Sequence, residues 1–250
     1  MKKIFISILL TVWCFSSFAQ KQRVNYLTTF DDKLIHFGFT IGVNTLDFNI
    51  ANYNPIGENP DFIPYPLDRI TKGSIIRSDV ATLIPGFTVG IISSLRLSKD
   101  FNLRFQPGLS FGERQITFNV PVKDINVYDE NLSYYSVKST FLDFPLLIKY
   151  KARRINNDRP YVIFGSAYRQ DISRTAQEDL IKLKSGGFYA EAGGGWDHYF
   201  PFFRFSVEAK FSFGLNNQLG DLPAPTQRQY YAQSIKSLRS KIFTLSFHFE

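Results

Sequence analysis

The sequence predicts an all-β fold, an eight-stranded antiparallel up-and-down transmembrane β-barrel with long external loops. Three observations predict it: segments that alternate apolar and polar residues, an apolar face rich in Phe, and a regular alternation of short and long connections. The clearest segment, residues 203–215, reads FRFSVEAKFSFGL. Strict alternation indicates an extended strand, and this one exceeds the about 9–11 residues that a tilted strand needs to cross a bilayer. Taken alone, it also fits an edge strand of a soluble sandwich, so the other segments decide.

The first half of the chain carries four such segments. Residues 35–44 place Ile, Phe and Val on one face and His36, Thr40 and small residues on the other. Residues 87–97 and 101–114 follow the same rule, joined by a tight turn at Lys99-Asp100. Residues 142–151 put Leu142, Phe144 and Leu146 outward. An outward apolar face and an inward polar face suit lipid outside and a polar lumen inside.

The second half carries the other four. Residues 160–171 are the least regular, with Val162, Phe164 and Tyr168 assigned outward. Residues 188–200 place Phe188 and Trp196 outward, and Pro201 makes the turn into residues 203–215. Residues 243–249 end the barrel with Phe and Leu outward. Because half of the residues in each segment are polar, the mean hydropathy of −0.13 does not reveal a membrane protein.

The connections support a membrane barrel over a soluble one. Those at residues 49–82, 121–139, 172–186 and 216–239 are long, and those between them are short. Transmembrane barrels have short periplasmic turns and long external loops, whereas a soluble barrel has no reason for this alternation. We therefore expect one barrel domain at residues 34–250 in the outer membrane, with both termini periplasmic and the last strand closing on the first.

The N-terminus has the pattern of a secretory signal peptide over residues 1–19. Lys2 and Lys3 precede an apolar run at residues 4–15, and Ser17 and Ala19 supply small residues for cleavage after Ala19. Residues 20–33 are then a periplasmic leader. The alternative is an uncleaved helical anchor, which the short apolar run disfavours.

Cleavage would remove the only Cys and the only Met, which excludes disulfides, cysteine nucleophiles and zinc–thiolate sites. The 29 Lys and Arg exceed the 22 Asp and Glu, but the basic residues are scattered and do not form a run that would follow a phosphate backbone. We therefore expect no nucleic-acid partner.

The inward positions carry charges of both signs. An eight-stranded barrel is just wide enough inside for side chains, so these charges suggest a salt-bridged plug rather than a pore. The alternative is that the charges have only a structural role. The predicted lumen charge network consists of Arg96, Arg104, Asp143, Lys149, Glu191, Arg204, Glu208 and Lys210.

Catalysis is not expected. The three histidines, His36, His198 and His248, fall near the periplasmic ends of their segments, whereas a barrel hydrolase gathers its catalytic groups at the external side. The one alternative is a metal site formed by His36 and His248, because the first and last strands are neighbours. We expect no enzyme activity, no cofactor, no metal and no small-molecule substrate.

Nearly all of the mature chain resembles the PorT family of Bacteroidetes outer-membrane barrels, called SprT in gliding bacteria. The segment that matches best is FPLLIKYK at residues 144–151, although a broad group of Bacteroidetes barrels shares it. The narrower resemblance rests on residues 36–48 and 95–114. Further matching residues are 85–87, 89–91, Arg154, Asn156, Asn157, Pro160 and Tyr161.

The resemblance implies a non-catalytic component or accessory of type IX protein secretion, and of gliding where present. Its partners would be outer-membrane lipid and other secretion-system subunits. The alternative is a passive barrel that only stabilises the envelope. The residues expected to contact partners are in the first and last long loops, unless they pack those loops together as a cap: Tyr53, Phe62, Ile63, Tyr65, Leu67, Arg228, Tyr230 and Tyr231.

Overall fold

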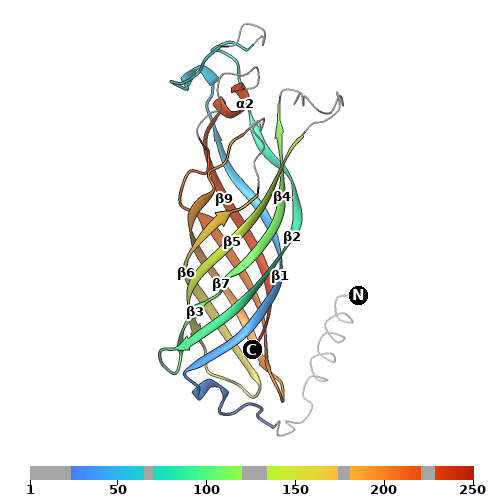
Figure 1. Ribbon diagram of the computed structural model, residues 1–250, viewed down its shortest axis with the longest axis vertical. Helices are drawn as coiled ribbons and strands as arrows, with labels where there is room; N and C mark the ends of the chain where they lie inside the picture. The colour runs from blue at the N-terminus through green and yellow to red at the C-terminus, as the bar shows by residue number, and fades with distance from the viewer. Residues whose placement is uncertain (1–23, 65–69, 120–133, 174–180, 221–228) are drawn as a thin grey trace, which may run out of the picture.

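The computed structural model describes residues 24–64, 70–119, 134–173, 181–220 and 229–250 (Figure 1). The predicted signal peptide lies outside these residues. Within them, no helix is long and apolar enough to cross a membrane.

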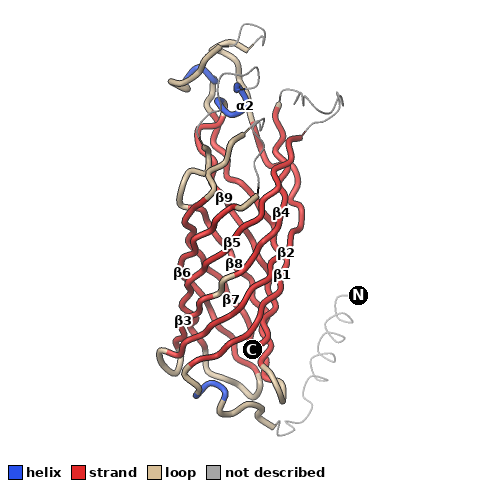
Figure 2. The backbone as a smooth tube through the Cα atoms, viewed as in Figure 1, coloured by secondary structure: helices blue, strands red, loops and turns tan. Residues whose placement is uncertain are grey.

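The described strands form one antiparallel sheet that closes on itself (Figure 2). β1 pairs with β9 on one side and with β2 on the other, which closes the ring. Closure leaves no edge with unpaired backbone groups, which a strand in lipid could not tolerate. The strands are β1 (Ile35–Asn52), β2 (Ser78–Arg96), β3 (Phe101–Phe105), β4 (Gly108–Phe118), β5 (Tyr134–Lys151), β6 (Asp158–Asp171), β7 (Gly186–Tyr199), β8 (Arg204–Gly214) and β9 (Ile235–Phe249).

Two of these strands are halves of one barrel strand. β3 and β4 both pair with β2 on one side and β5 on the other, and only Gln106 and Pro107 separate them. Proline has no N–H to donate to the ladder, which interrupts the strand at this point. The ring therefore has eight strand positions, and the predicted eight-stranded barrel is confirmed.

The two ends of the barrel differ (Figure 1). At one end, which we call the turn end, the connections β2–β3, β5–β6 and β7–β8 are short, and the 3-10 helix η1 (Phe30–Asp32) and Glu250 lie there. At the other, the loop end, the long connections carry the 3-10 helix η2 (Ile56–Glu58) and the short helix α2 (Gln229–Gln233).

The outer face of the barrel has an apolar band bordered by aromatic pairs. Toward the loop end, the ring centroids of Phe87 and Phe111 are 4.5 Å apart and those of Tyr168 and Phe188 are 5.2 Å apart. Toward the turn end, Phe101 and Tyr150 are 5.0 Å apart. Aromatic girdles of this kind lie at the two membrane–water interfaces of outer-membrane barrels.

The strands extend beyond this band at the loop end, further than the sequence predicted. In β1, inward side chains are polar up to Asn44, but Leu46 and Phe48 are also inward and are 0% and 5% exposed. The outward neighbours become polar over the same stretch, for example Asp47 and Asn49. β5 and β9 show the same reversal, so β5 begins at Tyr134 and β9 at Ile235, inside the connections expected at residues 121–139 and 216–239.

The reversal has a simple physical cause. Above the lipid, water surrounds the wall and the lumen contains only protein, so the stable arrangement is apolar inside and polar outside. Successive side chains still point alternately inward and outward, but the inward ones are now apolar and the outward ones polar. A pattern search that requires apolar residues outward therefore ends these strands too early.

Candidate functional site

The turn-end half of the lumen is filled by buried charged side chains. Arg104, which is 0% exposed, places its Nη1 2.7 Å from Oε2 of Glu208. The hydroxyl of Tyr161 donates to the same oxygen at 2.9 Å, and Nε2 of His248 lies 3.4 Å from Oε1. These residues come from β3, β6, β8 and β9, so Glu208 joins strands from opposite parts of the ring.

A second group of ion pairs lies beside it. Lys149 donates to both oxygens of Asp197, at 2.8 and 2.7 Å. Arg204 contacts Glu250 at 2.6 Å and Asp197 at 3.9 Å. Because Glu250 is also 3.6 Å from Arg104, the two groups form one continuous network.

The loop-end half of the lumen has its own network around Arg169. Its Nε is 2.9 Å from Asp143 and its Nη2 2.7 Å from Glu191. Lys210 contacts Glu191 at 3.0 Å, and Ser212 donates to the same carboxylate at 2.7 Å. All four charged side chains are buried, so each charge depends on its partners for the stabilisation that water would otherwise provide.

Arg114 marks the upper limit of the polar lumen. It is 1% exposed and forms no ion pair within the described part of the chain. Its guanidinium carbon lies 4.0 Å from the ring centroid of Phe48 and 5.6 Å from that of Phe141, and Nη2 donates to Ser240 at 3.0 Å. Aromatic faces thus take the place of a carboxylate below the apolar loop end.

Among the described residues, a small cavity lies between these side chains. It measures about 20 Å³ and lies in mid-lumen, lined by Gln106, Asp143, Arg169 and Lys210 together with small polar residues. A volume of that size holds about one water molecule. The described lumen thus has the character of a plug.

The leader closes the turn end. Asp31 of η1 accepts a hydrogen bond from Tyr199 at 2.6 Å and lies 3.1 Å from Arg159, 3.5 Å from Lys151 and 3.5 Å from Arg204. Burial alone would raise the pKa of Asp31, but the hydrogen bond and the three cations outweigh it and lower that pKa to about 2. The neighbouring Phe30 stacks on His36 with ring centroids 4.2 Å apart.

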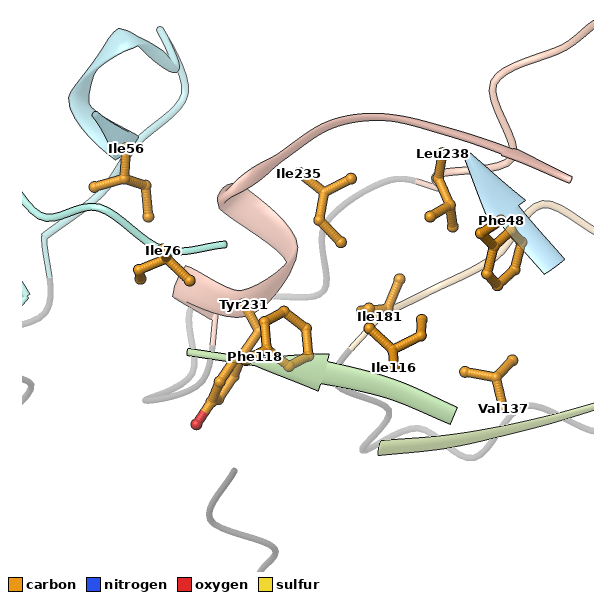
Figure 3. Close-up of a cluster of buried hydrophobic side chains, with 10 residues drawn as sticks. All are labelled: Phe48, Ile56, Ile76, Ile116, Phe118, Val137, Ile181, Tyr231, Ile235 and Leu238. Atoms are coloured by element: carbon orange, nitrogen blue, oxygen red, sulfur yellow. The ribbon is translucent and has the colours of Figure 1, made fainter. Parts of the chain in front are cut away.

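An apolar cap closes the loop end, and Figure 3 shows its side chains. At its centre, the rings of Phe118 and Tyr231 are 4.8 Å apart. Hydrogen bonds hold the first loop against α2 and the residue that follows it. Nδ2 of Asn59 donates to the carbonyl oxygen of Gln233 at 2.8 Å, and the backbone N–H of Tyr53 donates to the carbonyl oxygen of Ser234 at 2.8 Å. The buried members of this cap are Phe48, Ile56, Ile76, Ile116, Phe118, Val137, Ile181, Tyr231, Ile235 and Leu238.

The cap changes the role of some residues that were expected to contact partners. Tyr231 is 0% exposed, so its ring packs the cap instead of facing a partner. Phe62 and Tyr230 pack against the same cluster. Ile63 is 59% exposed and remains at the surface. Tyr65, Leu67 and Arg228 lie outside the described residues.

Seven of the eight residues of the predicted lumen charge network lie in the lumen, and the eighth, Arg96, does not. Arg96 lies at the rim of the turn end, where Nη1 contacts the carbonyl of Asp32 at 3.0 Å and its carboxylate at 3.3 Å. It is the last residue of β2, two residues after the inward Ser94, so its long side chain reaches the leader instead of the lumen. The seven lumen residues are Arg104, Asp143, Lys149, Glu191, Arg204, Glu208 and Lys210.

Sequence reasoning missed several partners in these networks. Arg169 could have been found, because it is two residues from the inward Ala167 on the strand whose outward residues were assigned correctly. Asp197 could have been found in the same way, because it lies six residues after the inward Glu191 on β7, an even spacing that puts both on one face. Asp31 and Glu250 lie outside regular strands, where no alternation indicates direction.

The histidines do not gather into a site. His198 lies on the outer face with Nδ1 2.7 Å from Asp158, whereas His248 is buried beside Glu208. Within the ranges described, no group of three or more His, Cys, Asp or Glu side chains is arranged to hold a metal ion.

A family model described as an outer membrane protein beta-barrel domain matches residues 18–220. The chain belongs to this family. It is therefore an outer-membrane β-barrel protein, in agreement with the closed ring, the apolar band and the aromatic girdles.

Solved structures similar to this outer-membrane barrel include OprG of Pseudomonas aeruginosa, with 11% identity, a TM-score of 0.40, and coverage of 86% of this chain and 91% of that one. Neisserial surface protein A has 7% identity and a TM-score of 0.40, covering 86% and 98%. Ail of Yersinia pestis has 10% identity and a TM-score of 0.34, covering 87% and 98%. A search of curated proteins found no match.

Proposed function

We propose that this outer-membrane barrel is a non-catalytic accessory of type IX protein secretion, and of gliding where that occurs. The PorT-like segments of the sequence suggest the system. The observation that carries the proposal is the closed lumen: charged networks, the leader and the cap occupy the described interior. A barrel whose described interior is filled in this way would act through its ends and its lipid face, so its partners would be other secretion subunits that contact the loops.

The orientation is part of the proposal. Short turns of outer-membrane barrels face the periplasm, so the loop end should face the cell exterior and both termini the periplasm. Lys72 and Lys99 are exposed at the loop end and the turn end, respectively. In whole cells, a membrane-impermeant maleimide should label Lys72→Cys and spare Lys99→Cys. The opposite labelling would reverse the orientation.

The function is tested on the exposed part of the first loop. Ile63 and Ile75 are 59% and 49% exposed, so changing both to Arg should leave the cap intact. We expect the amount of folded barrel to stay the same while secretion of cargo falls. The matched control is Ile155→Arg, because Ile155 is 68% exposed at the turn end.

The second candidate function is passive stabilisation of the envelope. The interlocked charges of the lumen favour it, because they suit a rigid barrel that needs no partner. A strain that lacks the protein discriminates the two. Loss of cargo secretion supports the accessory role, whereas normal secretion with greater sensitivity to detergent supports the passive one.

A further inference from the structure

A hollow opens on the outside of the barrel at the loop end, between the β6–β7 connection and the segment that follows β8. Its volume is about 770 Å³, within the range of about 300–1,000 Å³ that is usual for ligand sites. The residues that matter for its chemistry are Tyr168, Lys182, Lys184, Phe188, Asn216 and Asn217.

The backbone holds the two lysines on the outer side of a short ladder. The amide of Lys184 donates to the carbonyl of Gln218, and that of Gly220 to the carbonyl of Lys182, each at 2.8 Å. Leu183, between the lysines, packs inward against the cap. Because successive side chains of an extended segment alternate, Lys182 and Lys184 both point away from the cap, and both are exposed. Neither forms an ion pair with a described residue.

The two asparagines add neutral donors. Oδ1 of Asn216 accepts from the amide of Phe188 at 3.0 Å. Oδ1 of Asn217 accepts from the amides of Leu219 and Leu238, at 3.1 and 2.9 Å. With each oxygen held by backbone N–H groups, each side chain offers its NH₂ group as a donor. The hollow therefore combines two ammonium groups with two amide donors, and none of its described lining residues is a carboxylate.

The position of the hollow identifies the ligand class. Tyr168 and Phe188 form the outward aromatic pair at the loop-end border of the apolar band, and they also line the hollow. A molecule bound there would have its polar part against the lysines and its apolar part along the lipid-facing wall. We propose that the hollow binds the phosphate-bearing headgroup of a lipid in the outer leaflet. A free phosphate would not contact the aromatic border, whereas a lipid would place its phosphate against the lysines and its acyl chains along that border.

This inference rests on the orientation proposed above and not on the role in secretion. The test uses the purified full-length barrel in detergent and native mass spectrometry with lipid A as the probe. We expect lipid A to bind, and Lys182→Gln/Lys184→Gln to weaken it by roughly tenfold to thirtyfold, as for two lysines near an anionic surface. The control Lys138→Gln/Lys241→Gln removes two exposed loop-end lysines outside the hollow and should change the affinity less than about twofold.

Three further probes separate the sources of the phosphate. Lipid A stripped of its phosphates should lose most of its affinity, and inorganic phosphate alone should bind far more weakly than lipid A. Equal binding of stripped lipid A, or equal effects of the two lysine pairs, would overturn the proposal. Phosphatidylglycerol that binds better than lipid A would also contradict it, because the hollow would then suit the other leaflet. Gel mobility before and after boiling confirms that each variant is folded, and none of these outcomes depends on secretion.

Discussion

Arg104 and Glu208 face each other across the lumen, with Nη1 and Oε2 2.7 Å apart and neither side chain more than 1% exposed. They lie on β3 and β8, which are not neighbours in the ring, so the ion pair connects strands that no backbone hydrogen bond joins. Such a pair acts as a cross-brace inside the barrel.

The first prediction concerns this pair. Glu208→Gln should lower the free energy of unfolding by about 3–5 kcal/mol, because the buried Arg104 loses its closest charge partner and keeps only the longer contact with Glu250. Arg104→Gln should do the same to Glu208. The double variant should lose much less than the sum of the two, as measured by urea unfolding in detergent. Additive losses would show that the two side chains are not coupled.

The second prediction concerns the two faces of β8. Phe211 is 45% exposed on the lipid side, whereas its neighbour Lys210 is buried against Glu191. Phe211→Arg should cost about 2–4 kcal/mol of stability in bilayers or block assembly, because a cation would face the hydrocarbon. Lys210→Met should still insert, with Glu191 retained by Arg169. A barrel that tolerates the first change and fails with the second would invert the assignment of the faces.

The third prediction concerns pH and the leader. The pKa of Asp31 is lowered from 3.8 to about 2 in the folded protein, so its ionised form stabilises the docked leader above pH 4. That contribution, about 2 kcal/mol, should disappear as the pH falls from about 4 to 2. The protection factors of the Asp32 and Lys33 amides, which correct for the intrinsic pH dependence of hydrogen exchange, should then fall at low pH. In Asp31→Asn these protection factors should be low already at neutral pH and should change little with acid.

The fourth prediction concerns the cap. Tyr231→Ala should cost about 3–5 kcal/mol if the cap unfolds with the barrel, because it removes a fully buried ring that packs on Phe118. It should also make the loop end more sensitive to protease. Ile63→Ser is the matched control at the same end and should stay within about 0.5 kcal/mol, since the side chain is exposed. Equal protease resistance of the two variants would mean that the cap does not hold the loops.

The strands and their faces were predictable from the sequence where the barrel wall contacts lipid. Where the wall faces hydrocarbon, as at Phe211 and Phe247, alternation identifies both the strand and its faces, because the requirement for an apolar exterior is strict. The same parity placed Arg104 and Glu208 in the lumen. Alternation along one strand does not tell how far apart two inward residues on different strands lie. The ion-pair partners are therefore known only from the structure.

Beyond the lipid the sequence was harder to interpret. Leu46 and Phe48 continue β1, but their apolar side chains point inward and break the expected pattern. Asp31 reaches the lumen from an irregular segment, and only the three-dimensional arrangement brings it to Lys151, Arg159 and Arg204.

The change from apolar to polar outward residues within β1 also limits the depth at which the barrel can sit in the bilayer. Each residue along a strand advances about 3.3 Å, so sinking the barrel by one or two positions would carry Asp47 into hydrocarbon, and raising it would expose Val43 to water. Both displacements are unfavourable, and the loop end therefore stands at a constant height above the bilayer. A rigid partner anchored in the same membrane would meet that surface at a fixed level and would need to search only in the plane.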